Sequence, residues 1–271
     1  AKIADIFPSY RISIEGTSIS VPYGLKLHQT EIGSHKNPER TVFAADRIVI
    51  SPVVRSLFKE GLDLDIRCNA YGGQVTGRIH IPDDPAASPV KTMLDFKGIH
   101  LTEMFPAAET AERNLAGILN GTMAFTGNGN NPLESSGEAD IDLKDIQMKL
   151  PEPVFGLDTF SLTQVSAKIV LKNRRADVHD GRLHSEIMRG SFSGTIHLKD
   201  EPQDSALDLK GAIEPFAAFL QELESSENMT GQLRKTLQKG NLPFTIKGTL
   251  HEYKVRMLSL IHISEPTRLR R

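Results

Sequence analysis

Hydrophobic and polar residues alternate along this chain in short runs, and one such run recurs. Its copies are LDFKGIHL from Leu94, IDLKDIQM from Ile141, LDLKGAI from Leu207 and FTIKGTL from Phe244. In each copy two large apolar residues stand at positions i and i+2, which point to one face of a β-strand, and a Lys follows on the opposite face. The recurrence therefore predicts strands, and it contains no catalytic group.

The residue after each Lys is suited to a bend or a bulge. In the first copy the apolar positions change parity between Phe96 and Ile99, and in the second between Leu143 and Ile146. One extra residue in a β-bulge produces such a change. The residues concerned in the four copies are Gly98, Asp145, Gly211 and Gly248.

The same alternation predicts strands elsewhere. Residues 62–82 read as a hairpin whose tight turn is formed by Gly72 and Gly73, since glycine accepts positive φ. Further turns are predicted at 173–177 and 179–181, and a connection at 151–158. The other predicted strands are 10–32 (two or three strands), 41–50, 121–127, 160–171 and 190–198.

Three short helices are predicted between the strands. One opens with Ser51 as N-cap and Pro52 at its first position, with Val54, Leu57 and Phe58 on one side. A weaker helical stretch covers 102–119, with a helix from about Ala107 after Pro106. The clearest helical pattern covers 214–240, with Pro215 near its start.

These elements predict a mainly β fold: an elongated, curved, mostly antiparallel sheet with a few short helices. Strands do not alternate with long helices, which argues against a doubly wound α/β sheet. The recurrences are unevenly spaced, which argues against a propeller. We expect residues 1–257 to form this one domain, with bulges supplying its curvature.

Composition narrows the function classes. The chain has 271 residues and a formal net charge of -2, so it has no overall basic field and nucleic acid is not an expected partner. Its single cysteine, Cys68, excludes an intrachain disulfide and multi-cysteine metal sites, and we expect it to pack as a small strand residue in preference to acting as a reactive thiol. No run of about 18 apolar residues occurs.

The C-terminal residues differ in character from the rest. LSLIHISEPTR, from Leu258 to Arg268, matches the translation of a transposon-end sequencing adapter codon for codon. We therefore expect residues 258–271 to be an adapter-derived, non-structural tail, and we set aside its His and Arg residues as site candidates.

Three groups of polar residues could be read as sites. His179, Asp180, His184 and Glu186 could hold a metal, although a turn and a solvated strand face explain them equally well. Asn128, Asn130, Asn131 and Glu134 could suggest a calcium loop, but they lack the carboxylate density of one. Lys97, Lys144, Lys210 and Lys247 could form a ligand-binding ladder or a solvated face. We predict no catalytic, cofactor-binding or metal-binding residue.

The strand series resembles a known family, the type II secretion system protein N of deltaproteobacteria, which belongs with the AsmA-like periplasmic proteins. The resemblance covers nearly all of 1–257. The segments that carry it are VPYGLKL from Val21, ADRIVISPVVRSLFKEGLDLDIRCNAYGGQVTGRI from Ala45, DFKGIHLTEMFP from Asp95, SGEADIDLKDIQM from Ser136, HDGRLHSEIMRGSFSGTIHL from His179 and LPFTIKGTL from Leu242.

The resemblance implies a U-shaped, AsmA-like sheet on the periplasmic side of the bacterial inner membrane, held there by an N-terminal helix that would precede Ala1. It implies a non-enzymatic accessory of the type II secretion system whose partners are secretion proteins of the inner membrane. The alternative it implies is a lipid-binding or lipid-transfer protein that holds phospholipid in an apolar β-groove. The family supplies no site residues and no cofactor.

Overall fold

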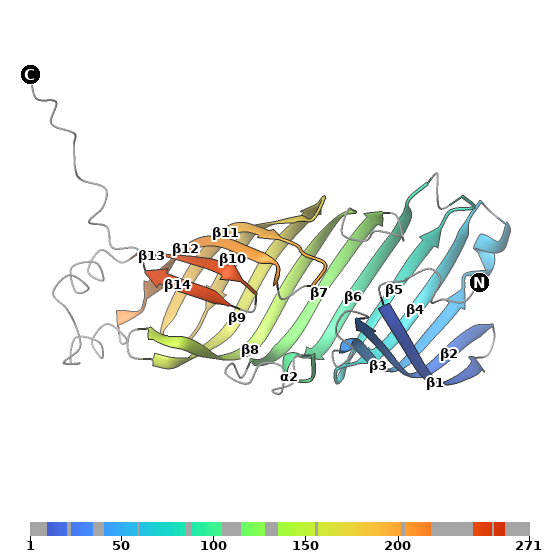
Figure 1. The fold of residues 1–271 in the computed structure, drawn as a ribbon, viewed down its shortest axis with the longest axis horizontal. Helices are drawn as coiled ribbons and strands as arrows, with labels where there is room; N and C mark the ends of the chain where they lie inside the picture. The colour runs from blue at the N-terminus through green and yellow to red at the C-terminus, as the bar shows by residue number, and fades with distance from the viewer. Residues whose placement is uncertain are drawn as a thin grey trace, which may run out of the picture.

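One antiparallel sheet accounts for almost all of the chain that the structure, a computed structural model, describes: residues 10–20, 23–34, 41–58, 60–84, 88–104, 115–127, 135–154, 157–201, 204–217, 241–250 and 252–257. Its 14 strands follow one another in sequence order across the sheet (Figure 1). The prediction of a mainly β chain grown by successive hairpins is confirmed.

The strands and short helices are bounded as follows. The first half of the sheet contains β1 Tyr10–Ser20, β2 Gly24–Ser34, β3 Thr41–Pro52, β4 Leu62–Ala70, β5 Gly73–Ile81, β6 Val90–His100 and β7 Ala116–Gly127. The second half contains β8 Ser136–Val154, β9 Leu157–Lys172, β10 Arg175–His184, β11 Met188–His197, β12 Ala206–Pro215, β13 Leu242–Thr249 and β14 Tyr253–Met257. The helical elements are the 3-10 helix η1 Val54–Phe58 and the single turn α2 Leu101–Met104.

Both predicted bulges are present. The register of β6 against β7 shifts between Phe96 and Ile99, where Gly98 has a φ of 65°. The amide of Gly98 leaves the ladder and donates to Asn120 Oδ1 at 2.9 Å. The second bulge lies in β8, where Asp145 has a φ of 51° and the register against β7 shifts. Each bulge lets the apolar residues on both sides of it face the same way.

Gly211 forms no bulge, although the residue is suited to one. It pairs in register with Phe192 on one side and Phe244 on the other. A Cβ on Gly211 would lie 2.6 Å from Phe244 Cζ, so the glycine is needed for close packing and not for a bend. The turn predicted at 179–181 is absent, because these residues form a bulge inside β10. Asp180 has a φ of 50° there, and the register shifts against both neighbouring strands.

One tight turn lies one residue earlier than predicted, and another is three residues shorter. Tyr71 and Gly72 form the turn between β4 and β5, with φ values of 51° and 69°, and Gly73 already pairs with Ala70 as the first residue of β5. A Cβ on Gly73 would lie 2.5 Å from the backbone of Gly98, which explains the second glycine. The turn predicted over 173–177 consists of residues 173 and 174, both with positive φ.

The predicted helix at Ser51 begins later. Ser51 and Pro52 continue β3 and pair with Asp65 and Leu64 of β4, so the sheet ladder displaces the expected cap. In the following 3-10 helix two residues of the predicted apolar side are exposed, Val54 at 53% and Phe58 at 87%.

Three other predictions also gave way to strand pairing. Pro215 is the last residue of β12 and pairs with Met188, so the helix predicted from 214 starts later, with Ala217 as a helical residue. Residues 116–119 belong to β7 and not to a helix, and 151–154 and 157–158 extend β8 and β9 beyond the predicted connection. Residues 107–114 of the second predicted helix, residues 218–240 of the third and the tail at 258–271 lie outside the described residues.

The left-handed backbone at Gly98 yields a test of the bulge. Replacing Gly98 with Ala should lower the free energy of unfolding by about 1–2 kcal/mol, because a side chain is disfavoured at this φ although nothing lies within 4 Å of its Cβ. Gly98→Asn should lose less, since Asn tolerates this region better. Urea denaturation followed by circular dichroism measures the differences.

The matched control is Gly16→Ala. Gly16 has no positive φ, and its Cβ would meet only His28 Cβ at 3.7 Å. We expect Gly16→Ala to change stability little. Equal losses at Gly16 and Gly98 would show that the left-handed conformation does not matter.

Candidate functional site

An unbroken row of apolar residues crosses the whole sheet. Its members lie directly opposite one another on consecutive strands and therefore share one face, which we call the inner face. Each position holds a hydrocarbon side chain, a methionine or a glycine. From β1 to β14 the row consists of Ile19, Leu25, Ile50, Ile66, Gly77, Leu94, Met123, Ala139, Ile169, Val178, Gly194, Leu209, Ile246 and Val255.

The adjacent row, one residue along each strand, has the opposite character. Its side chains point to the outer face, and all but Val49 are polar or charged. From β1 to β10 they are Ser18, Lys26, Val49, Arg67, Thr76, Asp95, Thr122, Asp140, Lys168 and His179. The sheet is thus amphipathic over most of its length.

The inner face lies on the concave side of the C-terminal half. Tyr253 of β14 shares its face with Val255, and its hydroxyl donates to Met148 Sδ of β8 at 3.1 Å. Those two strands stand six places apart in the sheet order, so a contact between them requires the sheet to curl over its inner face. Figure 1 shows the sheet as one long curved layer, with β1–β2 and β13–β14 turned across the strands at its two ends.

Side chains fill this concavity unevenly. Met188, Ile213, Leu242 and Phe244 form a buried cluster near the C-terminal end, against which Phe160 packs. A smaller cluster near the N-terminal end contains Ala45, Cys68 and Ala70. A cavity of about 420 Å³ lies against β8, β9 and the turn after β10. Its lining is mixed: apolar Ile146, Phe160, Leu162 and Ile187 stand beside polar residues that include Asp145, Gln147 and Glu186.

Between these clusters the long apolar row is half-buried, whereas Ile99 and Ile146, beside the two bulges, are buried. Leu94, Met123 and Ile169 of the long row are neither fully covered nor fully exposed, and the same holds for Phe96 and Leu143. Within the described residues no second sheet or long helix covers them. Such an extended apolar surface is typical of a site for an apolar ligand or partner.

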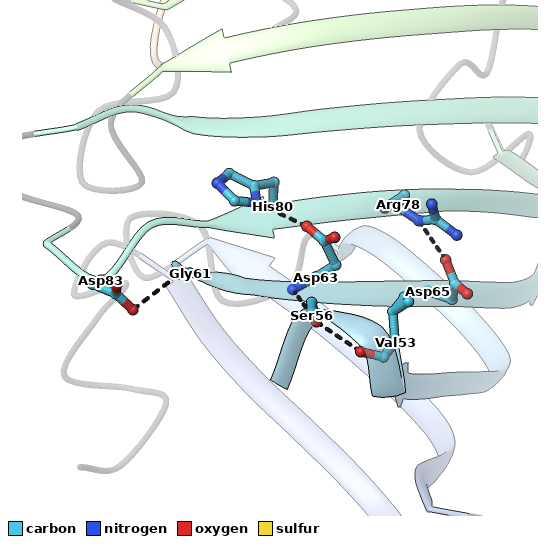
Figure 2. A network of polar contacts seen from close by, with 8 residues as sticks. All are labelled: Val53, Ser56, Gly61, Asp63, Asp65, Arg78, His80 and Asp83. Atoms are coloured by element: carbon cyan, nitrogen blue, oxygen red, sulfur yellow. Dashed lines mark hydrogen bonds and ion pairs between the residues drawn. The ribbon is translucent and has the colours of Figure 1, made fainter. Parts of the chain in front are cut away.

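The outer face is held by polar contacts between neighbouring strands (Figure 2). Arg78 Nε donates to Asp65 Oδ1 at 2.8 Å, and His80 Nδ1 lies 2.7 Å from Asp63 Oδ1. The amide of Asp63 also donates to Ser56 Oγ at 3.0 Å, which ties η1 to β4. These contacts fix the β4–β5 hairpin on the side opposite the inner face.

A second polar region on the outer face lies over β9–β12. A depression of about 570 Å³ there is lined by Gln164, Arg182, His184, Arg189 and Glu214, among others. Arg189 donates two hydrogen bonds to Glu214, at 2.7 and 2.8 Å, and these bonds lower the pKa of the Glu214 carboxyl. The pair therefore stays ionised under neutral conditions.

The four motif lysines do not form a ladder. No two of them lie opposite each other on adjacent strands. Three pair with an aspartate: Lys97 with Asp95 at 3.6 Å, Lys144 with Asp142 at 3.9 Å and Lys247 with Asp208 at 3.2 Å. Lys210 is exposed. The arrangement agrees with the solvated-face interpretation.

The structure does not bring the metal candidates together. His179 and Asp180 lie at the bulge of β10, His184 ends that strand, and Glu186 lies in the following turn. Among the described residues no group of three or more His, Cys, Asp or Glu side chains could hold a metal ion. The Asn128, Asn130, Asn131 and Glu134 loop lies outside the described residues.

Cys68 packs on the inner face, as predicted for a small strand residue. It is 4% exposed, and burial, with a further contribution from Asp46, raises the pKa of its thiol to about 11. The thiol is therefore neutral at physiological pH.

Alkylation of Cys68 tests this placement. At about pH 8 the raised pKa leaves about a hundredfold less thiolate than an ordinary cysteine has, so iodoacetamide should label the folded chain at least that much more slowly than the urea-unfolded chain. Mass spectrometry measures the rate, and Cys68→Ser gives the blank. Equal labelling rates in the folded and unfolded chains would contradict the burial.

Sequence reasoning identified the strands but not the row, because the row exists only once the register between strands is known. The alternation within single strands was its only signal.

Among the described residues, no helix has the length and hydrophobicity needed to span a bilayer. Comparisons with protein-family models, curated proteins and solved structures find no match to this chain.

Proposed function

We propose that this protein is a non-enzymatic lipid-binding protein whose inner face holds acyl chains. The observation that carries the proposal is the apolar row that crosses all 14 strands while its central members remain half-buried. Covering this surface with hydrocarbon would contribute about 25 cal/mol for each Å² removed from water. A lipid chain supplies such hydrocarbon without needing a hydrogen-bonding partner.

The dimensions of the inner face favour a linear apolar ligand. At about 4.8 Å between strands, a row across 14 strands follows a path of about 60 Å. One leaflet of a bilayer core is about 15 Å thick, half of the whole. The inner face therefore offers room for more than one lipid in file, as a binding or transfer protein would require.

Residues of the inner face have no chemical step to perform in this function. The row consists of hydrocarbon side chains, Met123 and two glycines, which can desolvate a ligand but cannot transfer a proton or attack a carbonyl. The polar outer face keeps the sheet in water.

The accessory role in type II secretion remains a separate proposal, motivated by the resemblance of the strand segments to secretion protein N, with a location on the periplasmic side of the inner membrane. Deleting the intact gene should impair secretion of the pathway's substrates. Unchanged secretion would count against this role and leave lipid binding to be judged on its own.

Single tryptophans provide the test of lipid binding, because the chain has no Trp. Met123→Trp places the probe on the inner face of β7, and Met93→Trp places it on the outer face of β6, where Met93 is 67% exposed. We expect dibrominated stearic acid, which quenches indole on contact, to quench Met123→Trp saturably and to leave Met93→Trp nearly unchanged.

A charged substitution completes the experiment. Leu94→Glu, added to Met123→Trp, should weaken binding about tenfold or more, because the acyl chain would have to desolvate a carboxylate. Met93→Glu is the matched control on the same strand. Equal quenching of the two tryptophans, or none at saturating ligand in a variant with native circular dichroism, would overturn the proposal.

A further inference from the structure

Exposed apolar side chains gather at one end of the first three strands. Of the large hydrophobic residues that are exposed among those described, five lie there, and we call them the apolar rim. They are Ile19 at 86% exposure, Tyr23 at 74%, Leu25 at 44%, Val54 at 53% and Phe58 at 87%.

Chain topology brings the five together. Ile19 is near the end of β1, Tyr23 lies in the turn, and Leu25 is the second residue of β2. The end of β3 lies beside this turn, since a Cβ on Gly24 would be 2.7 Å from Ser51 Oγ. Val54 and Phe58 follow in η1, directly after β3. The rim is therefore formed by two connections at the same edge of the sheet.

The rim is also continuous with the inner face. Ile19 pairs with Leu25, and Leu25 with Ile50, and these three are the first members of the long apolar row. An apolar chain entering at the rim could therefore reach Ile66 and Leu94 without crossing a polar surface.

We propose that the apolar rim inserts into the surface of a phospholipid bilayer and is the place where acyl chains enter the inner face. This inference rests on the proposed lipid-binding function and specifies its donor or acceptor, a membrane and not a soluble carrier. Insertion needs no spanning helix, because apolar side chains at a loop edge reach only the boundary between headgroups and acyl chains.

The chemistry of the rim favours a bilayer over a protein partner. Phe58, Ile19 and Val54 supply hydrocarbon, while Tyr23 has the apolar ring and polar tip that are enriched at membrane interfaces. Arg55 in η1 is exposed, and Lys26, the neighbour of Leu25, is half-buried. Both can meet lipid phosphates, and Glu60 is the acidic residue of the η1 connection.

Vesicle flotation tests the proposal with the full chain and phosphatidylcholine vesicles containing phosphatidylglycerol. Burial of a Phe and an Ile side chain in the bilayer contributes favourable free energy of binding. The double substitution Phe58→Ser with Ile19→Ser should therefore lower the partition constant for vesicles about tenfold or more. Both side chains are more than four-fifths exposed, so the variant should fold. Met93→Ser, an exposed apolar residue of the outer face, is the matched control and should bind as the parent does.

A spectroscopic readout locates the contact. In Tyr23→Trp the indole emission should shift to the blue when vesicles are added, whereas Met93→Trp should not shift. Lack of vesicle binding, or binding that survives Phe58→Ser with Ile19→Ser, overturns the proposal. The protein could instead self-associate with rising concentration, lose this association on the same substitutions, and bind no vesicles. That outcome would overturn the membrane proposal and assign the rim to an interface with a second copy of the chain.

The experiments distinguish failure of acyl-chain binding by the inner face from failure of membrane docking by the rim. Brominated stearic acid below its micellar range reaches Met123→Trp without a membrane, so quenching should persist in the rim variant if the rim serves only docking. Vesicle binding with no quenching at Met123 would retain the docking rim and remove the acyl-binding inner face. Quenching without vesicle binding would retain the inner face and overturn the docking proposal.

Discussion

Parity of side chains is the constraint on which this structure depends. A β-strand turns alternate residues to opposite faces, so a slip of one residue would carry its apolar set into water. The sheet must nevertheless bend, and a bend through an extra residue changes the parity. Gly98, Asp145 and Asp180 reconcile the two demands, because each adds a left-handed residue at the position where the apolar pattern also shifts. At each of these three bulges the bend and the consistently apolar inner face follow from the same residue.

The stability of this sheet does not come from one continuous hydrophobic core. The buried clusters sit near its two ends, around Phe244 and around Cys68, while the long apolar row remains half-covered in the middle of the sheet. Backbone pairing and outer-face contacts such as Arg78 with Asp65 must therefore contribute a large share of the stability there. Individual exposed ion pairs contribute little, about 0–1 kcal/mol each, so the ladder itself is the main support. An apolar ligand would supply what a second layer supplies in an ordinary sandwich.

The strand content and the bulges at Gly98 and Asp145 could be predicted from the sequence because both leave local traces, an alternation and a change in its parity. Boundaries were less predictable. Ser51 and Pro52 carry a helix-cap signature, yet pairing with β4 outweighs it, and the same competition keeps Pro215 in β12. His179-Asp180-Gly181 resembles a turn in composition, but both neighbouring strands pair across it. The apolar row and the rim depend on register and on the meeting of separate connections, which no single stretch of sequence records.

Each strand of this sheet pairs with its neighbours in the chain. With this order, the number of strands in the sheet can vary without changing its architecture. Most contacts are local in the chain, so adding or removing one hairpin would leave the other interfaces intact, much as in a repeat protein. Every hairpin gained would lengthen the apolar path by about 10 Å without altering its cross-section. A chain built in this way can change its length by duplication of a hairpin, and intermediate lengths would remain foldable at every step.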